Sequence, residues 1–148
     1  MSLEVKINND IKEAMKAKDQ ARLRGVRAIK SAILLLKTDG SGNEIDESAE
    51  IKMLQKLIKQ RQDSYDIYVK QNRADLATTE KEEMDVIMQY LPQQMSAEEL
   101  EAKIKIMIGE MGASGIKDMG RVMGAASKAF EGKADGKTIS GIVKTLLS

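Results

Sequence analysis

Hydrophobic residues recur every three or four positions along almost the whole chain, which is the period of an amphipathic α-helix. No segment alternates strictly between apolar and polar positions as a half-buried strand does, so the pattern predicts an all-α fold. A glycine-rich segment at 38–43 predicts a flexible loop. The expected helices span 3–17, 20–37, 46 or 48 to about 71, 74–90, 97–111, about 117–130 and about 138–147.

The single proline of the chain, Pro92, divides this pattern in two. Proline lacks a backbone donor and disfavours helix at the residue before it, so a helix is expected to end near Tyr90. The run Ser96-Ala97-Glu98-Glu99 then has the form of a capping box that begins the next helix. We therefore predict an N-terminal domain of four helices, residues 1–92, and a smaller C-terminal domain of three helices, residues 93–148.

The chain contains neither cysteine nor histidine. This excludes disulfides, the usual zinc sites, and Cys–His or Ser–His nucleophile pairs. No phosphate-binding loop or dinucleotide fingerprint occurs, so we predict no catalytic residue, no cofactor and no metal. There is no apolar run of membrane-spanning length and no hydrophobic leader, so we expect a cytoplasmic protein that does not engage a membrane.

Basic residues and glycines are interspersed at helical spacing between residues 112 and 137. Because the net charge of the chain is only +1, any binding of nucleic acid has to come from such a local patch. Several of these residues follow one another at steps of three or four opposite an apolar stripe, so we expect them on one exposed face. The candidate RNA-binding residues are Lys117, Gly120, Arg121, Gly124, Lys128, Lys133, Gly136 and Lys137.

Two interpretations of this segment stay open. In the first, the charges form an ordinary solvated face, and the spacing of Gly120 and Gly124 reflects packing against another helix. In the second, the glycines let a phosphate chain approach the backbone, and the loop from Gly132 to Lys137 exposes N–H groups as an anion nest.

Two other groups of basic residues receive a structural interpretation. Arg24, Arg27 and Lys30 make a narrow polar strip on the otherwise apolar second helix. The strip could contact a polyanion, but we favour its interpretation as the exposed edge of a buried helix. Arg61 lies inside the apolar stripe of the third helix, where an unpaired guanidinium would be costly. We predict that Arg61 forms an ion pair with Glu80 or Glu83, which fixes the register of two helices and has no catalytic role.

Five runs of the sequence resemble the YqeY family, and the resemblance extends over nearly the whole chain. They are Leu54–Arg61, Tyr90-Leu91-Pro92, Gly112-Ala113-Ser114, Lys117–Gly120 and Ala134–Lys137. The family is similar to the C-terminal tail of the B subunit of the tRNA-dependent amidotransferase. In that enzyme the tail helps to recognise the body of the tRNA, whereas the chemistry belongs to other parts. The resemblance implies two helical modules and assigns RNA contact to Lys117, Gly120, Arg121, Gly124, Gly136 and Lys137.

We therefore expect a non-catalytic helical protein that binds tRNA or another structured RNA. The alternative is an adaptor that docks on a tRNA-modifying or aminoacylation enzyme, such as a tRNA amidotransferase or a synthetase. It would contribute to carbon–nitrogen ligase activity, with glutamine as amido donor, only as part of that complex. Amidotransferase activity of the chain alone is least favoured, because 148 residues without a nucleotide-binding motif leave little room for it.

Overall fold

The computed structural model describes residues 2–39 and 45–148, so most of the loop expected at 38–43 lies outside the described residues. The described residues are helical with no strand, which confirms the all-α fold. A short 3-10 helix, η1, precedes α6. The elements are α1 (Leu3–Ala17), α2 (Gln20–Lys37), α3 (Glu47–Lys70), α4 (Ala74–Met88), α5 (Ala97–Met111), η1 (Ile116–Asp118), α6 (Met119–Ala129) and α7 (Gly136–Leu147).

Side-chain caps and a left-handed glycine set several helix boundaries. The Asp19 carboxylate accepts a hydrogen bond from the backbone N–H of Arg22 at 3.1 Å and begins α2. The Ser96 hydroxyl accepts one from the N–H of Glu99 at 3.2 Å and begins α5. Each cap satisfies a donor that has no partner within its helix. Gly112 ends α5 with φ of 63°, a conformation that glycine adopts without steric cost.

Two helix starts differ from those predicted. Residues up to Asp118 form the 3-10 turn η1, so α6 begins at Met119 instead of 117. Helix α7 begins at Gly136 instead of 138, because the Asp135 carboxylate accepts a hydrogen bond from the N–H of Thr138 at 2.6 Å. The sequence analysis placed Gly136 in a loop and overlooked Asp135 as a cap.

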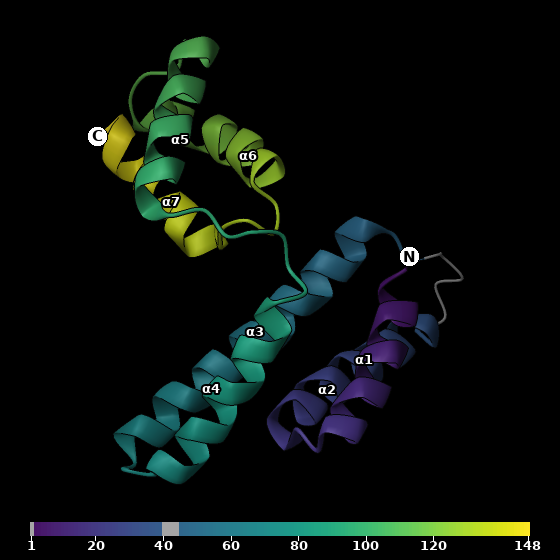
Figure 1. The fold of residues 1–148 in the computed structure, drawn as a ribbon. Helices are drawn as coiled ribbons and strands as arrows, with labels where there is room; N and C mark the ends of the chain where they lie inside the picture. Colours follow the sequence, from purple (N-terminus) through teal and green to yellow (C-terminus); the bar gives the residue numbers. More distant parts are fainter. Residues whose placement is uncertain (1, 40–44) are drawn as a thin grey trace. The chain divides into compact units, whose positions relative to one another are not determined.

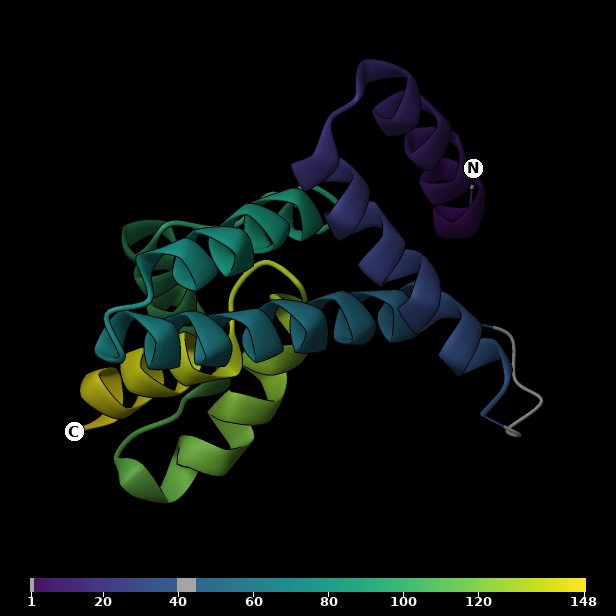
Figure 2. The ribbon, with the colours of Figure 1, turned by 90° about the horizontal axis from the view of Figure 1, so that it is seen from below.

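The chain divides into two compact units, Met1–Leu91 and Pro92–Ser148. In the first, called here the N-terminal unit, α3 and α4 pack as an antiparallel pair and α2 packs on both. Helix α1 doubles back along α2 (Figure 1 and Figure 2). The buried core of this unit is aliphatic and consists of Ile7, Ala14, Leu23, Val26, Ile29, Ile33, Met53, Leu54 and Ile87.

Helices α2 and α4 approach each other most closely at Gly25. A Cβ atom built on Gly25 lies 2.5 Å from Val86 Cγ1 and 2.7 Å from Val86 Cβ. Both distances are shorter than any stable carbon–carbon contact, so the helices reach this separation only because residue 25 has no side chain.

The end of α4 is tied to α1 and α2 through Tyr90. The Tyr90 hydroxyl donates a hydrogen bond to the carboxylate of Asp10 on α1. Arg22 Nη2 on α2 lies 3.5 Å from the same carboxylate, and Lys6 Nζ lies 5.1 Å from the centre of the Tyr90 ring. Burial, together with the hydrogen bond and charge of Asp10, raises the pKa of the Tyr90 hydroxyl well above its ordinary value.

We expect the N-terminal unit to lose stability above pH ~10, and to lose less in the Tyr90→Phe variant. Folding raises the pKa of Tyr90, so the unfolded chain releases this proton first. The contribution of Tyr90 is complete below the unfolded pKa and is lost as the pH rises towards the folded one. Urea unfolding followed by far-UV circular dichroism at neutral and alkaline pH measures the difference. An equal decline in both proteins would show that Tyr90 does not cause it.

The second unit, called here the C-terminal unit, packs α5, α6 and α7 around one core. The segment before α5 also belongs to it, because Gln94 Nε2 donates to the carbonyl of Gly132 at 2.5 Å and the N–H of Met95 donates to the carbonyl of Lys133 at 2.9 Å. The buried residues are Leu100, Ile104, Val122, Ala126, Phe130, Ile139, Val143 and Leu147.

Candidate nucleic-acid interface

One side of α6, extended by η1, carries cations and glycines. Val122, Ala126 and Phe130 are buried on the opposite side and hold α6 against α5 and α7. The exposed side has the helical spacing that the sequence predicted. We call it the α6 face, and its residues are Lys117, Gly120, Arg121, Gly124 and Lys128, all exposed.

The two glycines of the α6 face are not packed against another helix of the described chain. A Cβ atom built on Gly120 or on Gly124 has no neighbour within 4 Å. The expectation that their spacing serves helix packing is therefore wrong. A glycine inside a helix costs about 1 kcal/mol relative to alanine, and no packing contact of the described chain requires that cost at these two positions.

The cations of the α6 face differ in how they are engaged. Within the described part of the chain, Lys117 and Lys128 form no ion pair. Arg121 is partly held, because its Nη2 lies 3.7 Å from Asp118 Oδ1 and its Nη1 donates to the carbonyl of Met111 at 3.3 Å. Arg121 thus links α6 to the end of α5, and the two lysines are the freer cations of this face.

The other three predicted residues lie elsewhere in the C-terminal unit. Lys133 is exposed in the loop before α7, whereas Gly136 and Lys137 form the first turn of α7. Three N–H groups of the expected anion nest are already engaged, because those of Lys133 and Ala134 donate to the carbonyl of Phe130 and that of Thr138 donates to the Asp135 carboxylate. Lys137 instead lines a hollow of about 280 Å³ between α5 and α7, across from Glu101.

Helix α7 presents a second arrangement that the sequence analysis missed. Lys137, Gly141 and Lys144 are exposed at steps of four and three residues, and a Cβ built on Gly141 has no neighbour within 4 Å. The same spacing rule that identified the α6 face would have found them. Thr138 and Thr145 lie beside Gly141 in the hollow.

Two of the three cations of the α2 strip, Arg24 and Lys30, are engaged within the N-terminal unit, whereas Arg27 is exposed and forms no ion pair with the described residues. Arg24 Nη2 lies 2.6 Å from Glu82 Oε2. Lys30 Nζ donates to Asn8 Oδ1 at 2.6 Å and lies 3.9 Å from Glu4 Oε1. Neither side chain is free for a polyanion.

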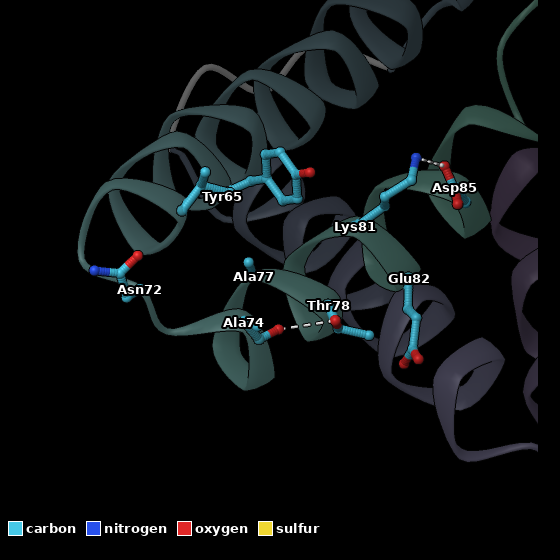
Figure 3. A pocket seen from close by; sticks show the side chains of 9 residues that line it. Tyr65, Asn72, Ala74, Ala77, Thr78, Lys81, Glu82 and Asp85 are labelled. Carbon is cyan, nitrogen blue, oxygen red and sulfur yellow. Dashed lines mark hydrogen bonds and ion pairs between the residues drawn. The ribbon is translucent and has the colours of Figure 1, made fainter.

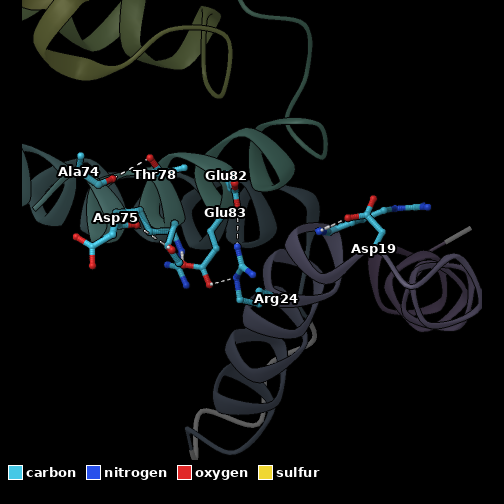
Figure 4. A network of polar contacts seen from close by, with 10 residues as sticks. Asp19, Arg24, Ala74, Asp75, Thr78, Glu82 and Glu83 are labelled. Carbon is cyan, nitrogen blue, oxygen red and sulfur yellow. Dashed lines mark hydrogen bonds and ion pairs between the residues drawn. The ribbon is translucent and has the colours of Figure 1, made fainter.

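Arg61 is half-buried and shares Glu83 of α4 with Arg24 of α2, so these contacts join α2, α3 and α4. Figure 4 shows Arg24 and Glu83 of this network. Its Nε lies 3.5 Å from Glu83 Oε2, and Arg24 Nε lies 3.9 Å from the other oxygen of Glu83. Arg61 Nη1 also donates to the carbonyl of Leu57 at 3.1 Å. Burial and the charge of Glu83 raise the pKa of Glu80, which the positive charge of Arg61 opposes. Among the described residues, Glu83 is the ion-pair partner of Arg61 and Glu80 is a more distant electrostatic neighbour.

An open groove of about 530 Å³ lies between the C-terminal half of α3 and the first half of α4 (Figure 3). Its walls are mainly apolar and include Tyr65, Val69, Ala74 and Ala77. Its charged groups are engaged by neighbours in the same unit, since Lys81 pairs with Asp85 at 3.6 Å and Glu82 pairs with Arg24. The groove therefore offers a mainly apolar surface whose charged side chains are already paired.

The described residues contain neither a cluster of metal ligands nor a membrane-spanning helix. No group of three acidic side chains lies close enough together to hold a metal ion in residues 2–39 and 45–148. No helix in the same ranges is both long and apolar enough to cross a membrane.

Comparison with known proteins gives one family and a set of yeast relatives. A family model described as "Yqey-like protein" matches residues 4–147. The protein "Altered inheritance of mitochondria protein 41, mitochondrial" of Lachancea thermotolerans is 36% identical over 107 residues, which is 71% of this chain and 57% of that protein. The proteins of the same name from Vanderwaltozyma polyspora and Saccharomyces cerevisiae strain YJM789 are 33% and 36% identical, over 71% and 64% of this chain and 58% and 51% of their own length. The chain thus spans about half the length of the curated relatives it matches.

The names of these relatives contradict the predicted cytoplasmic location, because they are mitochondrial proteins. The prediction used the lack of a hydrophobic leader, which bears on secretion only. Segments that direct proteins to mitochondria are amphipathic and rich in arginine, so hydropathy does not detect them.

Proposed function

The chain belongs to the YqeY family, as its resemblance predicted, and from this premise we propose that it is a non-catalytic protein that binds structured RNA, most naturally tRNA. In this proposal the smaller three-helix module, residues 93–148, is the RNA-binding part, as in the amidotransferase tail that the family resembles. The four-helix module, residues 1–92, is a separate helical domain joined to it.

One observation carries the proposal. The α6 face holds two exposed lysines, Lys117 and Lys128, that pair with no acid among residues 2–39 and 45–148, and an open glycine, Gly124, lies between them. Lysines that form no internal ion pair can neutralise phosphates without first giving up a partner. In the basic strip of α2, by contrast, the charges of Arg24 and Lys30 are already engaged.

The proposal is tested by filter binding of the full chain to total tRNA between about 50 and 200 mM salt. Contact with two to four phosphates predicts that log K falls with log salt with a slope of about −2 to −4. Because the net charge is +1, binding without a local patch would be negligible. Failure to bind tRNA at the lowest salt would refute the proposal.

The rival proposal is the adaptor that docks on a tRNA-amidotransferase or synthetase-type enzyme. It is supported by the apolar walls of the α3/α4 groove, where Val69 is half exposed. The adaptor predicts that the pure protein binds no tRNA, whereas it co-elutes with the enzyme in the absence of RNA. The filter-binding experiment therefore separates the two proposals.

A further inference from the structure

Helices α1 and α2 form the most basic part of the chain. Residues 1–38 contain nine lysines and arginines against four acidic residues, a side-chain charge of +5. Residues 45–92, which include α3 and α4, contain seven basic and ten acidic residues, a charge of −3. Residues 93–148 contain eight basic and seven acidic residues. The net charge of +1 for the whole chain therefore combines a strongly positive pair of helices with a negative pair.

The acidic side chains of α1 are all engaged by cations of α2. Glu4 Oε2 lies 2.5 Å from Lys37 Nζ, and this hydrogen bond lowers the pKa of Glu4. Arg22 Nη2 lies 3.2 Å from Glu13 Oε2 and 3.5 Å from Asp10 Oδ1. The carboxylates of α1 are thus used in holding the two helices together.

The lysines of α1 have no such partners. Lys12, Lys16 and Lys18 are exposed, and they pair with no acid in the described ranges, 2–39 and 45–148. Lys12 and Lys16 are four residues apart, so they are neighbours on the helix and repel each other. Lys18 follows directly after the last residue of α1. We call these three residues the α1 lysines, and no contact in the described chain offsets their repulsion.

Helix α3 shows what the same spacing looks like in the negative half of this unit. Lys52 and Lys56 are also exposed, four residues apart, and without an ion pair among the described residues. They share α3 and its cap, however, with several carboxylates. Burial, together with the charges of Glu47 and Asp46, raises the pKa of Glu50. The two lysines of α3 therefore lie close to negative charge, whereas the α1 lysines do not.

The exposed side of α1 is suited to a polyanion and poorly suited to a lipid surface. A helix that binds a membrane surface needs a free apolar face to insert. The apolar face of α1 is used in the core, where Ile7 and Ala14 have no exposed surface. The remaining apolar side chains, Val5 and Met15, are about half exposed and are not aromatic. Binding to phosphates, in contrast, requires only accessible cations.

We propose that the α1 lysines form a second phosphate-binding surface for the RNA that the α6 face binds. The inference rests on the proposed function, and it adds the N-terminal unit to the part of the chain that contacts RNA. Two phosphates on the α6 face alone would give a salt slope of about −2. Two more on Lys12 and Lys16 bring the slope to about −4, the steeper end of the range expected for the full chain.

The test is filter binding of the double variant Lys12→Gln/Lys16→Gln, in the full chain, to total tRNA between about 50 and 200 mM salt. Glutamine removes the charge without placing an acid at the C-terminal end of α1, where the helix dipole would oppose it. We expect affinity to fall about tenfold at the lowest salt, and the magnitude of the salt slope to fall by ~2, because two phosphate contacts are lost.

Lys52→Gln/Lys56→Gln is the matched control. It removes the same charge, at the same spacing, from another exposed helix of the same unit. It should bind tRNA as the wild type does, with the same salt slope. Far-UV circular dichroism verifies that both variants are folded, which the exposure of all four lysines favours.

Sedimentation with vesicles of phosphatidylglycerol and phosphatidylcholine tests the other anionic partner. We expect the wild type and the α1 variant to sediment to the same small extent, because α1 has no free apolar face. If the wild type sediments with the vesicles and the α1 variant does not, while both bind tRNA equally well, the surface is specific for lipid and the RNA inference is overturned.

The outcomes in tRNA binding separate the inference from the proposed function. If the α1 variant binds tRNA as the wild type does, or loses as much affinity as the control, the inference is overturned and RNA binding by the α6 face survives. If the α1 variant loses affinity while neutralising Lys117 and Lys128 changes nothing, the inference stands and the α6 face is excluded. If the wild type binds no tRNA at the lowest salt, both are overturned.

Discussion

Replacing Gly25 with alanine is expected to lower the free energy of unfolding of the N-terminal unit by about 1–3 kcal/mol. The new methyl group would lie 2.5 Å from Val86 Cγ1 and 2.7 Å from Val86 Cβ. Rotation of the valine side chain does not relieve the second contact, because Cβ is fixed by the backbone of α4. Helices α2 and α4 must therefore separate, which loosens the core around Val26 and Ile87. This loss outweighs the roughly 1 kcal/mol that alanine gains over glycine in a helix.

Tyrosine fluorescence measures this effect in the N-terminal unit alone. All three tyrosines, Tyr65, Tyr68 and Tyr90, belong to that unit, and the chain has no tryptophan. Urea titrations of the wild type and Gly25→Ala give the difference, and Gly109→Ala serves as control because its methyl group meets nothing. An unchanged or higher midpoint for Gly25→Ala would show that the helices separate without loss of stability.

The helices and their caps could be predicted because their signals are local in the sequence. The spacing of apolar residues, Asp19 and Ser96 as caps, and Gly112 as a left-handed end all act within one or two helical turns. The start of α7 was predicted wrongly although its signal is equally local. Asp135 is a good N-cap, but the neighbouring glycines, Gly132 and Gly136, were interpreted as part of a loop.

Contacts between distant segments could not be predicted in the same way. Tyr90 meets Asp10 across eighty positions of sequence, and the partner of Arg24 comes from α4. From the sequence alone, Tyr90 and Arg24 could pair with many acidic side chains. The packing of the four helices brings Asp10 to Tyr90 and Glu82 to Arg24. The partner of Arg61 could be predicted more closely, because Glu80 and Glu83 are the acidic residues beside the apolar stripe of the following helix.

For the candidate site, the sequence predicted which residues share a face and could not say what that face contacts. Lys117, Gly124 and Lys128 are exposed along one side of α6 as their spacing indicated. A glycine, however, looks the same in the sequence whether a neighbouring helix touches it or not. Gly25 is tightly packed and received no attention, whereas Gly124 was expected to be packed and is open. Distinguishing the two requires the positions of atoms from other helices.

Reversing both free charges of the α6 face, in Lys117→Glu/Lys128→Glu, is expected to lower affinity for tRNA by about 10²-fold at low salt. Two phosphate contacts are lost, which also reduces the magnitude of the salt slope by ~2. The fold should be unaffected, because both side chains are exposed and neither forms an ion pair in the described structure. Arg121 is left unchanged, since its contacts with Asp118 and Met111 give it a structural role that would confuse the result.

The control for this variant is Lys103→Glu/Lys105→Glu, which changes the net charge equally with two exposed lysines of α5 in the same unit. If affinity depended on overall charge, both variants would lose it to the same extent. A loss confined to the α6 variant would place the phosphates on that face, because only the position of the charges differs between the two proteins. An equal loss in both, or none in the α6 variant, would exclude the α6 face as the RNA-binding surface.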